Sequence, residues 1–105
     1  MPDALPILEF QRPCFLAGRN TSVRRGRRWL GVAMARIRMG DGSLSAPCTL
    51  QTDCRPFASL TDADLRDEHD PDCRCVAGLL AVLQSLYPGF SADEDVTLVH
   101  FSLEP

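Results

Sequence analysis

The chain has 105 residues, of which 45% are hydrophobic and 24% are charged, and its formal net charge at pH 7 is −3. This length leaves little room for a second core, so residues 1–105 are predicted to form a single domain, and the composition excludes a disordered chain. No apolar run approaches the roughly 18 residues of a membrane helix and the N-terminus is acidic, so we expect a cytoplasmic protein without a membrane partner.

Strands dominate the prediction for the first half of the chain. Short apolar or alternating runs, bounded by Gly, Pro and Asp-Gly turn signals, predict strands at residues 7–10, 21–25, 29–39 and 48–54. Between the first two, Pro13 and Gly18 are placed as the start and stop of one helical turn over residues 14–17. Gly31 is expected to mark a bulge in the third strand.

The second half is predicted to contain helices and a final strand. Thr61, followed by acidic residues, indicates the start of a short helix that ends near Glu68. Asp72 is expected to cap a longer amphipathic helix that stops at Pro88-Gly89. Alternation over residues 96–103 then predicts a last strand.

The modest net charge conceals two halves of opposite sign. Residues 1–60 carry nine arginines against four carboxylates, whereas residues 61–105 carry two arginines against ten carboxylates. Five arginines fall within residues 19–28, a density that suits a phosphate-facing surface. The alternative is an arginine-rich loop whose partners are the acidic residues of the second half. All eleven basic residues are arginine, so the chain has no lysine.

The cysteines offer a weaker signal. The five cysteines are odd in number and irregularly spaced, which favours reduced thiols over a disulfide framework. His69, Cys73 and Cys75 provide three possible zinc ligands, but a closed structural site needs four and their spacing fits no common zinc motif. We therefore predict no metal and no cofactor, and interpret these residues as a loop that leads into the long helix.

The order of landmarks along the chain resembles an ASCH domain over about residues 6–103. The segments that carry this resemblance are FLAGRNT (15–21), GRRWLGVA (26–33), PFASLTDAD (56–64), Asp67-Glu68, LYPG (86–89) and VTLVHFSL (96–103). The resemblance implies an α+β fold, with a PUA-like β-barrel of five or six strands and two or three flanking helices. It also implies a cleft between residues 18–25 and the segment near Glu68.

Members of this family are thought to bind RNA, and small bacterial members include 4-acetylcytidine amidohydrolases. Those enzymes use a Lys and a Thr from a Gly-Arg-Lys-Thr-x-Thr-x-Arg stretch, together with a Glu from the segment after Leu-Thr-x-x-x-Ala. The chain resembles this pattern only in part. The matching positions are Arg19, Thr21, Arg25 and Glu68. The family's lysine position is Asn20, and its second threonine falls on Val23, or on Ser22 if one residue is deleted. Because arginine cannot act as a base at neutral pH, the family's catalytic scheme is incomplete in this chain.

The binding features of such a cleft are better represented than the catalytic ones. Arginine forks suit phosphate, while amide and carboxyl groups suit the edge of a base. The predicted binding residues are Arg19, Asn20, Thr21, Arg24, Arg25 and Glu68. An active enzyme would use Glu68, Ser22 and Thr21. We thus predict a protein that binds RNA or a modified cytidine nucleoside in a basic cleft, with an amidohydrolase as the alternative and a protein-interaction module third. No obligate protein partner is expected.

Overall fold

The computed structural model describes residues 4–103, which form six strands, one α-helix and three 3-10 helices. The strands are β1 (Ile7–Leu8), β2 (Gly18–Arg25), β3 (Met34–Ile37), β4 (Cys48–Thr49), β5 (Gln51–Pro56) and β6 (Asp95–Leu103). The helices are η1 (Phe57–Ser59), η2 (Asp62–Leu65), η3 (Pro71–Cys73) and α1 (Val76–Leu86). None of the helices in this part of the chain is long and apolar enough to cross a membrane.

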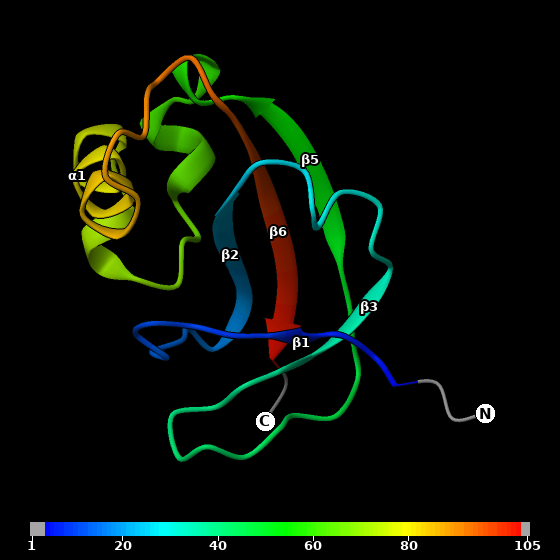
Figure 1. Ribbon diagram of the computed structural model, residues 1–105. Coiled ribbons are helices and arrows are strands. Elements are labelled where there is room, and N and C mark those ends of the chain that lie inside the picture. The colour runs from blue at the N-terminus through cyan, green and yellow to red at the C-terminus, as the bar shows by residue number, and fades with distance from the viewer. Residues whose placement is uncertain (1–3, 104–105) are drawn as a thin grey trace.

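The strands lie in two sheets of three. In the larger sheet, β6 pairs antiparallel with β2 on one side and β5 on the other. In the smaller sheet, β3 pairs parallel with β1 and antiparallel with β4, and Figure 1 shows β1 and β3 crossing over the larger sheet. The α+β class is therefore confirmed. The closed barrel is not, because the described strands form two separate hydrogen-bonded sheets.

The two faces of β6 pack against different partners. Val96 and Leu98 belong to an apolar cluster with α1 and the 3-10 helices, whereas Val99 and Phe101 belong to a second cluster beneath β1 and β3. Successive strand residues point to opposite faces, so alternation buries this strand on both sides. The last strand predicted from the sequence, β6, is thus the middle strand of the larger sheet and lies between the two apolar clusters.

Two predictions for the first half are wrong in detail. Residues 14–17 form no helical turn, because the side chain of Asn20 bonds to the backbone of Leu16 and holds the segment in another conformation. The strand predicted over residues 29–39 is reduced to β3. Gly31 has a φ of 80° and lies in a turn that precedes this strand rather than in a bulge.

Two predictions for the second half also change. The helix expected up to Glu68 is the short 3-10 helix η2, after which Glu68 forms an isolated parallel bridge with Thr21. The long helix is capped by the thiol of Cys75 and not by Asp72, because Asp72 is already part of η3. The end of α1 before Pro88 is confirmed.

Candidate functional site

A cavity of about 320 Å³ lies beside the edge of β2 that faces away from β6. The backbone of Thr21 pairs here with a passing segment: its N–H donates to the carbonyl of Asp67 (2.7 Å), and its carbonyl accepts from the N–H of His69 (3.0 Å). The chain then turns away into η3. The next part of the β2 edge, at Ser22 and Arg24, therefore lines the cavity together with Glu68.

Glu68 is the most unusual polar group of this cavity, because its residue is only 2% exposed. Its Oε1 accepts a hydrogen bond from the backbone N–H of Asp70 (2.8 Å), and the backbone of Val23 also bonds to the carboxyl group. Burial nevertheless raises the pKa of Glu68 to about 7, since those bonds offset the desolvation only in part. A carboxyl group of this kind exchanges its proton near neutral pH, as a general acid or base must.

His69 lies next to this carboxyl group. Its Nδ1 lies 3.0 Å from the carbonyl oxygen of Cys14, which only accepts, so Nδ1 carries a hydrogen. The Nε2 atom of the neutral ring is then an acceptor, 3.4 Å from Oε1 of Glu68. Burial lowers the pKa of His69, and a proton between the two groups therefore favours Glu68. The carboxyl group can accordingly donate as well as accept.

Arg24 is a half-buried cation on the wall of the cavity. Its Nε donates to Oγ of Ser22 (2.9 Å), its Nη2 donates to the carbonyl of Glu9 (2.6 Å), and its Cζ lies 4.7 Å from the ring centroid of Phe10. Burial lowers the pKa of Arg24 to about 10, so the group remains charged at neutral pH. Because Ser22 accepts from Arg24, its own hydroxyl proton is available to a ligand or a base.

Two aromatic side chains complete the walls. Phe10 packs edge-on against His69, with ring centroids 4.6 Å apart. Tyr87 lines the cavity from the end of α1 and is 38% exposed, while Arg25 lies with its Cζ 5.2 Å from the Tyr87 ring centroid. A planar ligand can stack on such rings.

Asn20 and Thr21 do not face this cavity. Asn20 is fully buried, and its amide bonds to the N–H and carbonyl of Leu16 and to the carbonyl of Gly18. Its predicted contact with a base edge is therefore replaced by a structural role. Thr21 is 1% exposed, and its hydroxyl lies 2.9 Å from Nδ1 of His100. Because it contacts His100 and does not line the cavity, this hydroxyl is poorly placed as a nucleophile there.

Arg24 and Arg25, which we predicted to act together, lie on opposite faces of β2. Strand residues alternate in direction, so Arg25 turns away from Ser22. Its Nε and Nη2 donate to the two carboxylate oxygens of Glu94, at 2.7 and 3.1 Å. Arg25 thus contacts the cavity only through Tyr87.

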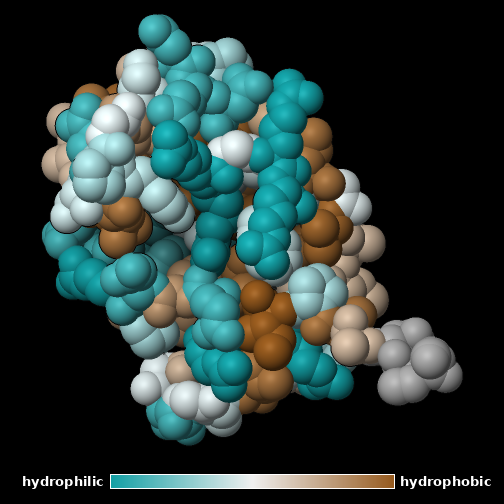
Figure 2. Space-filling view, in the orientation of Figure 1, coloured by the Kyte–Doolittle hydropathy of each residue, from teal (hydrophilic) through white to brown (hydrophobic). Residues whose placement is uncertain are grey.

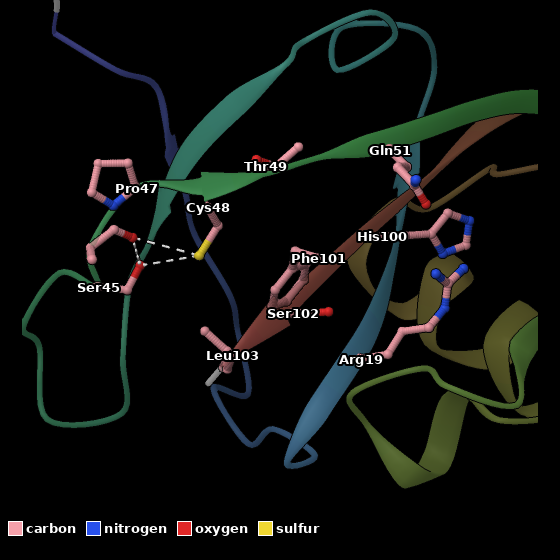
Figure 3. A pocket seen from close by; sticks show the side chains of 11 residues that line it. Arg19, Ser45, Pro47, Cys48, Thr49, Gln51, His100, Phe101, Ser102 and Leu103 are labelled. Atoms are coloured by element: carbon pink, nitrogen blue, oxygen red, sulfur yellow. Dashed lines mark hydrogen bonds between the residues drawn. The ribbon is translucent and has the colours of Figure 1, made fainter. Parts of the chain in front are cut away.

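A second hollow, a groove of about 590 Å³, opens at the other end of β2. It forms because β5 pairs with β6 only from Gln51 onward, while the preceding residues, in β4, pair with β3 instead. Arg19 lines one end of the groove, and its Nε lies 3.2 Å from a carboxylate oxygen of Asp67. Figure 3 shows Arg19 and His100 side by side there, away from Cys48 of β4. Arg19 therefore belongs to a different hollow from Glu68.

The basic half of the chain is largely joined to the acidic half by ion pairs. The pairs that join the two halves are Arg12 with Asp70 and Asp72, Arg19 with Asp67, Arg25 with Glu94, Arg27 with Asp95, and Arg55 with Asp64. These contacts favour the alternative that many of the arginines serve intramolecular partners. Figure 2 shows hydrophilic residues over the upper part of one face and an apolar area where β1 crosses it.

The possible zinc ligands occupy different surroundings. His69 faces Glu68, Cys73 is buried, and the sulfur of Cys75 accepts from the N–H of Gly78 at the start of α1. Burial raises the pKa of Cys73 to about 12, which keeps its thiol protonated. Within residues 4–103, no cluster of three or more His, Cys, Asp or Glu residues could hold a metal ion.

Sequence reasoning missed three residues of the cavity. None of them is among the predicted site residues: His69 is only a possible zinc ligand in a loop, Tyr87 part of the segment that ends the long helix, and Phe10 the end of a strand. The position of His69 directly after Glu68 was an available signal. The placement of Phe10 and Tyr87 on opposite sides of one cavity was not, because it depends on contacts between distant segments.

Comparisons of the chain with protein-family models, curated proteins and solved structures found no match.

Proposed function

We propose that the chain is an RNA- or nucleoside-binding protein of the ASCH type, which takes a modified cytidine or an RNA base into the cavity beside Glu68. One observation carries this proposal. A buried carboxyl group, a fixed guanidinium and a hydroxyl, from Glu68, Arg24 and Ser22, line a single cavity.

The size and the chemistry of the cavity suit a base. Its volume of about 320 Å³ falls at the lower end of the range for small-molecule sites, which suits a compact planar ligand. The edge of a base carries donors and acceptors side by side, and Glu68 can serve as either partner because its pKa is about 7. Phe10 and Tyr87 supply rings for stacking, while Arg24 supplies a donor to a carbonyl or phosphate oxygen.

The resemblance to ASCH domains supports the same conclusion. It implies a cleft between residues 18–25 and the segment near Glu68, and Ser22, Arg24 and Glu68 do share one cavity. The PUA-like barrel implied by the resemblance remains part of this proposal, with the two described sheets as its candidate walls.

Direct binding tests the proposal. We would titrate the protein with cytidine and 4-acetylcytidine by calorimetry, beside the variants Glu68→Gln and Arg24→Gln. Loss of a hydrogen bond to a charged group costs about 1.5–3 kcal/mol, so Arg24→Gln is expected to weaken binding about tenfold or more. Arg28→Gln, at an exposed position outside the cavity, is the matched control and should bind normally. Equal affinities in all four proteins would refute the site.

The hydrolase remains a second candidate because of one contact. Nε of Arg24 donates to Oγ of Ser22, and such a donor stabilises the alkoxide that forms when a base removes the hydroxyl proton. Glu68, in the same cavity, is the candidate base that would pass this proton to the leaving amine, which departs as cytidine and leaves the acetyl group on Ser22. A water molecule that gives its proton to Glu68 would then attack this ester, release acetate and restore the Ser22 hydroxyl, without the lysine of the family scheme.

Chromatography separates the two candidates. An enzyme converts 4-acetylcytidine to cytidine, and both Ser22→Ala and Glu68→Gln abolish the conversion while Arg28→Gln does not. A binding protein shows saturable affinity for the nucleoside and no conversion. Neither binding nor conversion would remove both candidates.

A further inference from the structure

The groove at the end of β6 brings Arg19 and His100 together on one face of the larger sheet. In the antiparallel register, Thr21 lies opposite His100 and Arg19 lies opposite Ser102. Arg19 and His100 are therefore diagonal neighbours that point to the same side. Figure 3 shows the guanidinium and the imidazole next to each other at the mouth of the groove.

Both side chains are held in place but remain accessible. The hydroxyl of buried Thr21 lies 2.9 Å from Nδ1 of His100, which fixes the ring and leaves Nε2 free of this contact. Asp67 holds Nε of Arg19 at 3.2 Å, yet the Arg19 side chain remains 50% exposed. The pair thus offers oriented nitrogen donors to a ligand in the groove.

The rest of the lining is suited to an anion. The chain has 14 Asp and Glu residues, but none of those within residues 4–103 lines this groove. Its other polar side chains include Thr49, Gln51 and Ser102, which can donate hydrogen bonds, whereas the hydroxyl of Ser45 already donates to the carbonyl of Ala46 (2.7 Å). A hollow with two basic side chains, several neutral donors and no lining carboxylate complements negative charge.

We propose that this groove is a second binding site, which takes a phosphate group between the guanidinium of Arg19 and the imidazole of His100. The phosphate belongs either to a free anion or to an RNA strand whose base occupies the cavity beside Glu68; only the RNA source rests on the proposed function. Arg19 and Ser22 are three residues apart on β2 and point to opposite sides of the strand, so an RNA strand that reached both hollows would have to pass around the edge of the larger sheet.

The charges around His100 make it a reporter for this site. Burial lowers the pKa of His100, and the neighbouring charges act in both directions: Arg19 and Arg55 lower it, while Asp53 and Asp67 raise it. An added phosphate stabilises the imidazolium, so binding should raise the pKa of His100. Nuclear magnetic resonance of the imidazole C–H signals measures this change without any substitution.

The experiment titrates the wild-type protein with inorganic phosphate, with an RNA trinucleotide and with an unphosphorylated nucleoside. Phosphate and trinucleotide should shift the His100 signals and raise its pKa, while the nucleoside should not. Arg19→Gln should weaken trinucleotide binding about tenfold and reduce the slope of log affinity against log salt by about one. Arg28→Gln should leave both quantities near their wild-type values, and Arg19→Gln should leave nucleoside affinity unchanged.

Each outcome decides a separate point. A stronger response to the trinucleotide than to phosphate supports the RNA source, whereas equal responses support the site with free phosphate alone. Unmoved His100 signals with both probes would overturn the proposal. Failure of the nucleoside to bind beside Glu68 refutes the proposed function but leaves the phosphate result standing.

Discussion

Replacement of Glu68 by Gln should stabilise the folded protein at neutral and alkaline pH. Burial raises the pKa of Glu68 from 4.5 to about 7, so between these values the folded state holds a proton that the unfolded state has lost. The free energy of unfolding of the wild-type protein therefore falls as the pH rises through this window. The neutral amide of Gln has no such dependence.

The size of the effect follows from the shift. A difference of about 2.5 pKa units, at about 1.4 kcal/mol per unit, corresponds to about 3 kcal/mol. Solvent screening reduces this figure little, since Glu68 is 2% exposed. The variant and the wild-type protein should have similar stability near pH 4.5, and the variant should be more stable by up to about 3 kcal/mol near pH 8.

Urea denaturation at several pH values measures this difference. His69 contacts Glu68, and because burial lowers the pKa of His69, its effect on stability has the opposite sign. A second comparison, of Glu68→Gln/His69→Gln with His69→Gln alone, isolates the carboxyl group. A stability difference that stays constant from acid to alkaline pH would refute the buried, proton-holding state of Glu68.

Three further predictions concern other parts of the molecule. Asn20→Ala removes the partner of the half-buried N–H and carbonyl of Leu16 and should lower the free energy of unfolding by about 2 kcal/mol, as measured in urea. A loss within error would contradict the structural role of this amide. Gly78→Ala should destabilise the protein by about 2 kcal/mol in the same assay, because the Asp72 carbonyl oxygen occupies the space of the new Cβ. Alanine favours helices, so a gain in stability would show that this contact is loose. Tyr87→Leu should weaken nucleoside binding about tenfold by calorimetry with little change in stability, and unaltered affinity would exclude stacking on this ring.

Local signals in the sequence were sufficient for some elements. The alternation of residues 96–103 predicted β6 because successive side chains of a strand face opposite sides. The apolar spacing before Pro88 predicted the body and the end of α1, since proline cannot continue a helix. The resemblance places Glu68 among the predicted site residues, whereas its burial and its position in one cavity with Arg24 come from the tertiary structure.

The start of α1 and the course of residues 14–17 could not be read from local patterns. Both depend on side chains that satisfy backbone groups elsewhere: the thiol of Cys75 caps the helix, and the amide of Asn20 replaces a helical turn. A sequence pattern ranks residue types by average preference, and it does not reveal which particular donor finds which acceptor.

The sequence alone determined the class of the fold, the positions of the strongly periodic elements and the set of residues with suitable chemistry. Tertiary structure decided which of those residues act together. The short bridge between Thr21 and Glu68 buries the carboxyl group beside Ser22 and Arg24, whereas strand alternation turns Arg25 away. The pKa of Glu68 likewise arises from desolvation by distant segments, and burial of that kind exists only once the chain has folded.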